Sequence, residues 1–247
     1  LQIPVFNILI PVIFSSGFIL IYLMYDSQVK MGQLEGSLQS YLPPVVVNEI
    51  KNNPDSDLLK IGGKRKRISV IFSDIVQFTK FTDEADPEEV QLVLDEYFSI
   101  MVGLIFNNGG IVDKYMGDGI LAFFENSPDS VTSAQLATKT AIQMQEKAII
   151  LNNKYKEQHR FPFEIRVAIS TGYAKVGNIG PKEKIDYTII GSVVNLGQRL
   201  DALGKPGDIV MDKDTYLFIK DDYDIEDFGE HSLKGFEKPI QVYKLKK

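Results

Sequence analysis

The sequence contains no cysteine, and its only histidines are His159 and His231. The absence of cysteine excludes a disulfide scaffold, a thiolate zinc site and a cysteine nucleophile. The two histidines do not form a pair with metal-ligand spacing, so zinc chemistry is not expected. Each histidine is interpreted as a surface or packing residue.

The chain also lacks an excess of positive charge, since its formal net charge is -6 and its pI is about 5.1. A general nucleic-acid binder is usually basic, so no nucleic-acid partner is expected. The basic run from Lys64 to Arg67 is short and leads into a predicted strand. We interpret it as a solvated strand start near a membrane surface.

Charged residues are absent from residues 1–25. The apolar run from Ile3 to Tyr25 is long enough to cross a bilayer core, and it predicts a transmembrane helix. A secretory signal would have a shorter apolar region preceded by basic residues, and a buried core helix is the other alternative. Because the sequence begins at Leu1 rather than Met, we expect a fragment of a longer protein.

Residues 26–63 are predicted to form a helical linker. Apolar residues in 26–42 follow roughly a three- and four-residue spacing, typical of a short coiled-coil seam or of a single amphipathic helix. Pro43 ends this helix, and Pro44 opens a second short one. Residues 52–63 are polar and contain glycine and proline, which indicates a hinge.

Residues 64–247 are predicted to form one α+β domain, with helices on one face of a mostly antiparallel sheet. Asp86 is expected to cap a helix that begins with Pro87 and carries an apolar stripe. Glu89 is expected to reach back to the cap. The other predicted elements are strands at residues 68–75, 111–116, 120–124 and 163–170, and helices at 129–157 and 193–203.

Two acidic residues occupy special positions in this pattern. Asp74 ends the first buried strand, and Asp118 lies at the tip of a Gly-Asp-Gly hairpin. If the two strands are neighbours, the carboxylates converge, and a carboxylate pair with substrate phosphates is a common way to hold Mg²⁺. Taken singly, each residue would be interpreted as a turn or cap residue.

Several segments, in their order and spacing, resemble class III adenylate and guanylate cyclases from about Gly62 to Leu245. They are residues 70–75, Phe78 with Thr79, 113–119, 172–180, 186–191, 194–196, Arg199 and 233–236. The resemblance implies a ferredoxin-like βαββαβ core with extra C-terminal αβ elements. It also implies conversion of ATP to 3′,5′-cyclic AMP and pyrophosphate by attack of the 3′-hydroxyl on the α-phosphate.

The resemblance assigns roles to particular residues. Asp74, Asp118 and the main-chain carbonyl of Ile75 would hold two divalent cations, Mg²⁺ or Mn²⁺. Amides from Val76 to Thr79, including Phe78, would cradle the phosphates. The remaining roles are base reading by Lys114 and Thr188, ribose orientation by Asn195, charge stabilisation on the α-phosphate by Arg199, and triphosphate contact by Lys234, with Lys184 as a weaker candidate.

The base-reading pair favours adenine. Lys114 can only donate hydrogen bonds, whereas Thr188 can accept one. Adenine presents an acceptor at N1 and a donor at its amino group, while guanine presents N–H donors along the same edge. A lysine with a threonine resembles the IIIb branch of the family. Leaving buried polar groups unpaired against the wrong base costs about 1–3 kcal/mol per group.

In this family each site forms between two catalytic domains, so the resemblance implies a homodimer with composite sites. One subunit would supply Asp74 and Asp118, and the other would supply Lys114, Thr188, Asn195 and Arg199. An upstream sensor, absent from this chain, would act through residues 1–63. Because ATP is cytosolic, we expect the catalytic part in the cytoplasm at the inner or plasma membrane.

Other interpretations remain open. They are a catalytically weak nucleotide-binding regulator, a guanylate cyclase, a cyclic-dinucleotide synthase and a membrane-anchored interaction module. Two positions depart from the family pattern: Gly197 stands in a predicted helix, where it costs about 1 kcal/mol against alanine, and Gln77 replaces a commoner arginine or glycine.

Overall fold

The computed structural model divides into two compact units, Leu1–Leu59 and Lys60–Lys247, which we describe separately. The residues described are 6–39, 44–53, 60–127, 131–158 and 160–246.

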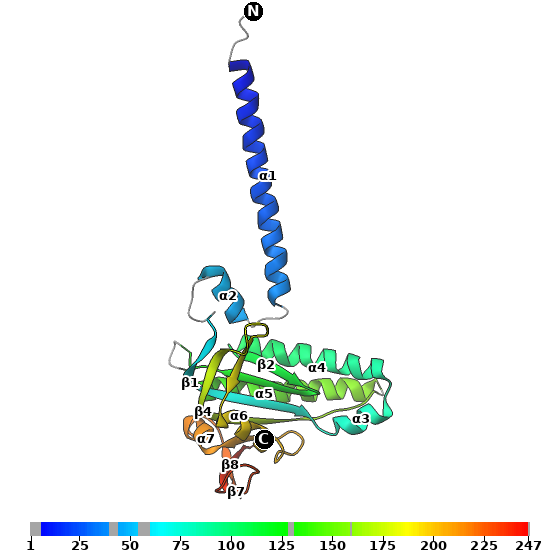
Figure 1. Cartoon of the computed structure of the whole chain (residues 1–247). Coiled ribbons are helices and arrows are strands. Elements are labelled where there is room, and N and C mark those ends of the chain that lie inside the picture. Colours follow the sequence, from blue (N-terminus) through cyan, green and yellow to red (C-terminus); the bar gives the residue numbers. More distant parts are fainter. Residues whose placement is uncertain (1–5, 40–43, 54–59, 128–130, 159, 247) are drawn as a thin grey trace, which may run out of the picture. The chain divides into compact units, whose positions relative to one another are not determined.

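The first unit contains two helices, α1 (Phe6–Gln39) and α2 (Pro44–Asn52) (Figure 1). The boundary predicted after residue 25 falls inside α1, because one continuous helix covers residues on both sides of it. The second helix begins at Pro44, as predicted, since proline lacks an N–H that the first helical turn does not need. Residues 40–43, which include Pro43, lie outside the described residues.

The transmembrane prediction for residues 1–25 is not supported. Its first residues, 1–5, lie outside the described residues, and the rest belong to α1. In the described part of the chain, no helix is both long enough and apolar enough to span a membrane.

The second unit is built on one mixed sheet with helices on both faces, whereas the sequence predicted helices on one face. Its strands are β1 (Gly62–Ile75), β2 (Ile111–Met116), β3 (Gly119–Phe124), β4 (Ile165–Ile179), β5 (Asp186–Ile190), β6 (Ile209–Asp212), β7 (Ile225–His231) and β8 (Ile240–Leu245). Its helices are α3 (Phe78–Glu84), α4 (Pro87–Asn107), α5 (Ser133–Glu157), α6 (Ser192–Asp201) and α7 (Lys213–Ile219). Of these, α4 and α5 cover one face, and α6 packs against Phe72 on the other.

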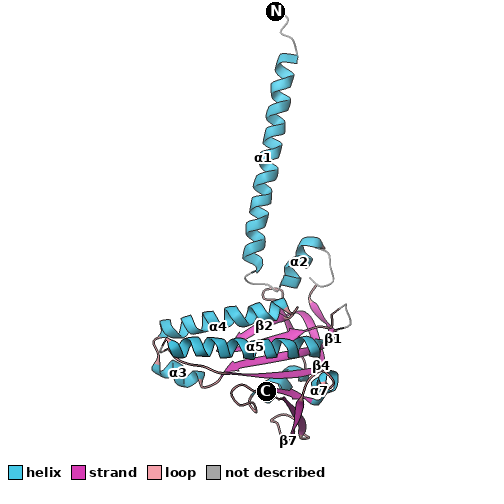
Figure 2. Ribbon diagram, turned by 180° about the vertical axis from the view of Figure 1, so that it is seen from behind, coloured by secondary structure: helices cyan, strands magenta, loops and turns pink. Residues whose placement is uncertain are grey.

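The strand order confirms the predicted α+β class. The sheet runs β2-β3-β1-β4-β6-β8-β7, and β5 pairs with β4 off this path. The first four strands are antiparallel neighbours and, with α4 and α5, follow the order βαββαβ. This is the ferredoxin-like arrangement, and β6 to β8 with α7 form the C-terminal addition. Figure 2 shows α4 and α5 lying side by side along one face of the sheet.

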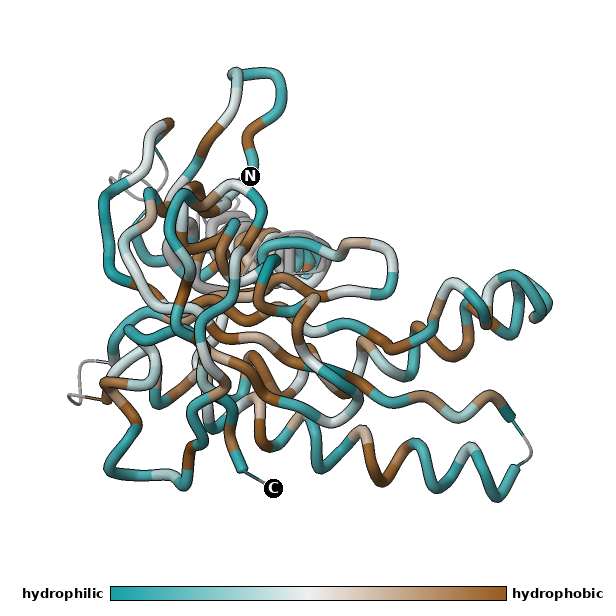
Figure 3. The backbone as a smooth tube through the Cα atoms, turned by 90° about the horizontal axis from the view of Figure 1, so that it is seen from below, coloured by the Kyte–Doolittle hydropathy of each residue, from teal (hydrophilic) through white to brown (hydrophobic). Residues whose placement is uncertain are grey.

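The core lies between that face and the two long helices. In α4 the buried residues Val93, Tyr97, Met101 and Ile105 recur every four residues and form one stripe. They pack with alternate residues of the central strands, Ile71 of β1 among them. Figure 3 shows many brown, hydrophobic segments where the strands cross near the centre, and teal, hydrophilic segments are common in the connecting loops.

The helix starts differ in detail from the prediction. Asp86 is the N-cap residue of α4 and Pro87 its first residue, but the Asp86 side chain makes no capping hydrogen bond. The capping box belongs instead to α5, where Thr132 and Gln135 satisfy each other's main-chain N–H groups. That box places the start of α5 at Ser133, later than the residue 129 expected from composition.

Candidate active site

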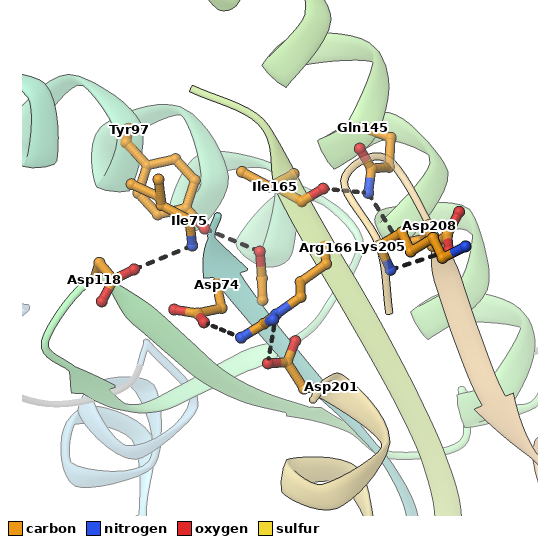
Figure 4. Close-up of polar contacts among 11 residues, drawn as sticks. Asp74, Ile75, Tyr97, Asp118, Gln145, Ile165, Arg166, Asp201, Lys205 and Asp208 are labelled. Carbon is orange, nitrogen blue, oxygen red and sulfur yellow. Dashed lines mark hydrogen bonds and ion pairs between the residues drawn. The ribbon is translucent and has the colours of Figure 1, made fainter. Parts of the chain in front are cut away.

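The structure brings Asp74 and Asp118 together. Asp74 is near the end of β1, and Asp118 lies in the turn between β2 and β3 (Figure 4). Because β3 pairs directly with β1, the hairpin tip lies beside the end of β1. The main-chain N–H of Ile75 donates to Asp118 Oδ2 at 3.2 Å, which fixes the hairpin tip to β1.

The environment of Asp118 disfavours its ionised form. Burial, together with a hydrogen bond to Asp74 and the negative charge of that residue, raises the pKa of Asp118 to about 7. Two carboxylates held together in this way would each be stabilised by a shared cation. In the described part of the chain no group of three or more acidic or histidine side chains forms a metal site. Two carboxylates would supply only part of the oxygen ligands that a divalent cation such as Mg²⁺ takes.

Arg166 was not predicted as a site residue. It lies opposite Asp74 in the β1–β4 register, and its Nη2 donates to Asp74 Oδ2 at 2.7 Å. Its Nε donates to Asp201 Oδ2, at the end of α6, at 3.0 Å. Burial raises the pKa of Asp201 to about 6, although Arg166 acts in the opposite direction. Arg166 thus joins the predicted metal carboxylate to the helix that carries Asn195 and Arg199.

The predicted phosphate loop is only partly free to bind. The N–H of Val76 donates to the carbonyl of Glu164 at 2.8 Å, so this amide is already occupied. Phe78 and Thr79 begin α3, where the first N–H groups have no partner within the helix. Gln77 adopts a left-handed conformation with φ of 61°, which explains why glycine suits this position.

The predicted base-reading residues lie on two strands that approach each other. Lys114 is on β2 and Thr188 is on β5. The Asp113 side chain accepts a hydrogen bond from the Ile189 N–H at 3.3 Å and also lies 3.2 Å from Lys114 Nζ. The buried hydroxyl of Thr188 has no hydrogen-bond partner among the described residues.

Asn195 and Arg199 share one helix, α6, four residues apart, as predicted. Asn195 is exposed and Arg199 half-buried, and neither side chain pairs with another described residue. Gly197 has a packing role: a Cβ there would come within 2.8 Å of the Phe72 ring and of Ser170 Oγ. The glycine therefore lets α6 lie close against the sheet, which offsets its cost in helix propensity.

The two predicted triphosphate lysines are not joined to the acidic pair. Lys234 is exposed in the connection between β7 and β8, and Lys184 is exposed between β4 and β5. Among the described residues, no hydrogen bond or ion pair connects either lysine, Asn195 or Arg199 to Asp74 or Asp118. The acidic pair is connected to α6 through Arg166 and Asp201, and not by direct contact with these predicted residues.

The structure thus combines a paired-carboxylate edge of a ferredoxin-like sheet with a second set of polar residues on α6. The model of the adenylate and guanylate cyclase catalytic domain family matches residues 63–247. Because this match covers most of the chain, the chain belongs to that family.

Solved structures of both kinds of cyclase are similar to this chain. The adenylyl cyclase CyaB from P. aeruginosa is 35% identical, with a TM-score of 0.70 over 74% of this chain and 95% of that one. The guanylyl cyclase Cya2 is 30% identical, with a TM-score of 0.69 over 75% of this chain and 94% of that one. Fold similarity therefore does not separate the two substrates.

Curated relatives are longer than this chain. Adenylate cyclase 1 of Rhizobium meliloti (strain 1021) is 27% identical over 183 residues, which is 73% of this chain but only 28% of the relative. A Mycobacterium tuberculosis (strain CDC 1551 / Oshkosh) protein, MT1361, is 28% identical over 80% of this chain and 35% of its own length. This chain thus spans about a third of the length of each of these relatives.

Proposed function

We propose that the chain is an adenylate cyclase that converts ATP to 3′,5′-cyclic AMP and pyrophosphate. The observation that carries the proposal is the placing of Lys114 beside the strand that bears Thr188. A lysine donor and a threonine acceptor complement the N1 and amino groups of adenine, whereas guanine offers N–H donors that lysine cannot accept.

In the proposed reaction a bond forms between O3′ and the α-phosphorus, and the bond from that phosphorus to the bridging oxygen of the β-phosphate breaks. The 3′-hydroxyl loses its proton and pyrophosphate leaves. Two divalent cations, held by Asp74, Asp118 and the Ile75 carbonyl, would lower the pKa of the hydroxyl and neutralise the triphosphate. The protein otherwise acts by positioning and by charge stabilisation.

The residues on α6 would act on the ribose and the α-phosphate. Asn195 would orient the ribose, and Arg199 would stabilise the negative charge that develops during transfer. Neither side chain is engaged by the described chain, so both are available to a ligand. The resemblance to the cyclase family implies a homodimer in which two subunits complete each site, one supplying Asp74 and Asp118 and the other Asn195 and Arg199.

The test is product formation by the purified chain with Mg²⁺ or Mn²⁺, with ATP and GTP compared by chromatography. We expect cyclic AMP from ATP and little product from GTP, and no product from an Asp74→Ala variant. A preference for GTP would instead support the second candidate, a guanylate cyclase, which the similarity to Cya2 favours. No product from either nucleotide, in a folded dimer, would support a nucleotide-binding regulator.

A further inference from the structure

A bulge in β2 determines which way Lys114 faces. Val112 pairs with Ala122 and Lys114 with Leu121, so Asp113 is an extra residue without a partner on β3. In a regular strand Lys114 would share a face with Val112, which packs against the helical core. The inserted residue reverses the alternation, and Tyr115 contacts Phe98 of α4 instead, with ring centroids 4.5 Å apart.

Lys114 is thereby turned to the opposite face of the sheet, toward β5. Phe123 of β3 points to that face, because its neighbours Ala122 and Phe124 belong to the helical core. The ring of Tyr187, on β5, lies 6.5 Å from the ring of Phe123. The bulge therefore places Lys114 on the same side of the sheet as the strand that carries Thr188.

The bulged residue itself connects the two strands. The Asp113 side chain is fully buried, whereas that of Lys114 is 52% exposed. Asp113 Oδ1 accepts from the Ile189 N–H, next to Thr188, at 3.3 Å. Asp113 Oδ2 lies 3.2 Å from Lys114 Nζ in an ion pair, but makes no hydrogen bond with any described residue. The Asp113 carboxylate thus contacts both Lys114 and β5, the strand that carries Thr188.

We propose that Asp113 is a positioning residue for base recognition. It holds the Lys114 ammonium against β5, so that the lysine donor and the unpaired Thr188 hydroxyl meet the adenine edge together. A free lysine side chain occupies many rotamers, and restricting it before the nucleotide binds lowers the entropy cost of recognition. The inference rests on the proposed function, because it assumes that Lys114 and Thr188 read the base.

The test compares ATP and GTP kinetics of the Asp113→Asn full chain with those of the wild type. Asparagine keeps an acceptor for the Ile189 N–H but loses the charge that holds Lys114. We expect KM for ATP to rise about tenfold, with a smaller fall in kcat, and the preference for ATP in kcat/KM to fall about tenfold. Asp224→Asn, which breaks an exposed ion pair with Lys246 (2.8 Å), should match the wild type.

A Lys114→Met variant, alone and combined with Asp113→Asn, distinguishes a failure of the positioning role from a failure of base reading. If Asp113 acts through Lys114, the combined variant should discriminate between ATP and GTP no worse than Lys114→Met alone. Wild-type discrimination by a folded Asp113→Asn chain, or fully additive losses in the combined variant, would overturn the positioning role. Unchanged discrimination in Lys114→Met would overturn base reading itself.

Folding is checked by circular dichroism for every variant. If Asp113→Asn does not fold, Asp113→Glu serves instead, because it keeps the charge on a longer arm. We expect the Glu variant to retain part of the ATP preference that Lys114→Met loses. A folded Glu variant as impaired as Lys114→Met would overturn the inference.

Discussion

Arg166 donates a hydrogen bond to Asp74 across neighbouring antiparallel strands, from Nη2 to Oδ2 at 2.7 Å. The same guanidinium contacts Asp201 through Nε at 3.0 Å. Asp74, a predicted metal ligand, is therefore paired with the positive charge of Arg166. The same guanidinium also pairs with Asp201 of α6. This arrangement gives the acidic site a defined structure before any cation binds.

Replacing Arg166 with methionine tests this pairing. The variant leaves two partly buried carboxylates without their cation, so we expect the free energy of unfolding to fall by about 1–3 kcal/mol. Because Asp74 and Asp118 then repel without compensation, Mg²⁺ should raise the Tm of Arg166→Met more than that of the wild type. Thermal unfolding with and without Mg²⁺ measures both effects. Equal Mg²⁺ shifts would contradict the explanation, and Lys246→Met is the matched surface control.

Mixing two inactive chains tests the shared site. Asp74→Ala and Arg199→Ala each remove one half of a composite site, so neither homodimer should turn over ATP. Random mixing makes half of the dimers mixed, each with one intact site, and should restore about a quarter of wild-type turnover. The measurement is cyclic AMP formation after co-refolding, with dimerisation checked by light scattering. An inactive mixture of confirmed heterodimers would argue that each site lies within one chain.

Gly197→Ala and Gly103→Ala should have opposite effects on stability. At Gly197 a Cβ meets Phe72 and Ser170 at 2.8 Å, whereas at Gly103 of α4 nothing lies within 4 Å. Overpacking costs about 1–3 kcal/mol and exceeds the helix-propensity gain of about 1 kcal/mol. We therefore expect Gly197→Ala to lower both Tm and turnover, and Gly103→Ala to raise Tm. Similar stabilisation by both alanines would show that α6 can move away from the sheet without cost.

Asp212 should make stability depend on pH. It is buried and accepts hydrogen bonds from the N–H groups of Thr215 (2.9 Å) and Thr171 (3.3 Å). Burial raises its pKa from 3.8 to about 6. The folded state thus holds the carboxyl proton more tightly than the unfolded state does. The stability that protonated Asp212 contributes is complete below about pH 4 and is lost as pH rises through about 6.

The Asp212→Asn variant, which cannot ionise, avoids that loss. We compare the free energy of unfolding of the variant with that of the wild type at each pH. The variant's advantage should be larger at pH 8 than at pH 4, by at most about 3 kcal/mol. Urea unfolding of both chains at the two pH values gives the comparison. A difference that does not change with pH would mean that Asp212 ionises normally in the folded chain.

Local sequence signals predicted the central elements well. The Gly-Asp-Gly turn and the flanking β-branched and aromatic residues indicated the β2–β3 hairpin, and the structure has it within one residue. The four-residue stripe of α4 was equally clear, because it depends only on the period of the helix. The position of Asp118 followed from the turn alone, and its approach to Asp74 needed only that β1 and β3 pair.

Features that depend on long-range pairing were not predictable. Arg166 stood in a predicted strand, but only the β1–β4 register places it opposite Asp74. Its charge between the apolar residues Ile165 and Val167 was a signal that could have indicated it, although Glu164 in the same predicted strand is charged as well. The basic run at Lys64 extends β1 back to Gly62 because β4 continues far enough to pair with it. The bulge at Asp113 likewise arises from pairing with β3, which the local pattern does not encode.

The bulge in β2 also gives that strand one residue more than its pairing with β3 requires. Deleting Asp113 would make the ladder regular and leave Lys114 opposite Leu121, so the lysine would keep its face of the sheet. The carboxylate that contacts both Lys114 and the Ile189 N–H would be lost. The extra residue thus supplies a contact between β2 and β5 that a regular strand at this position would lack.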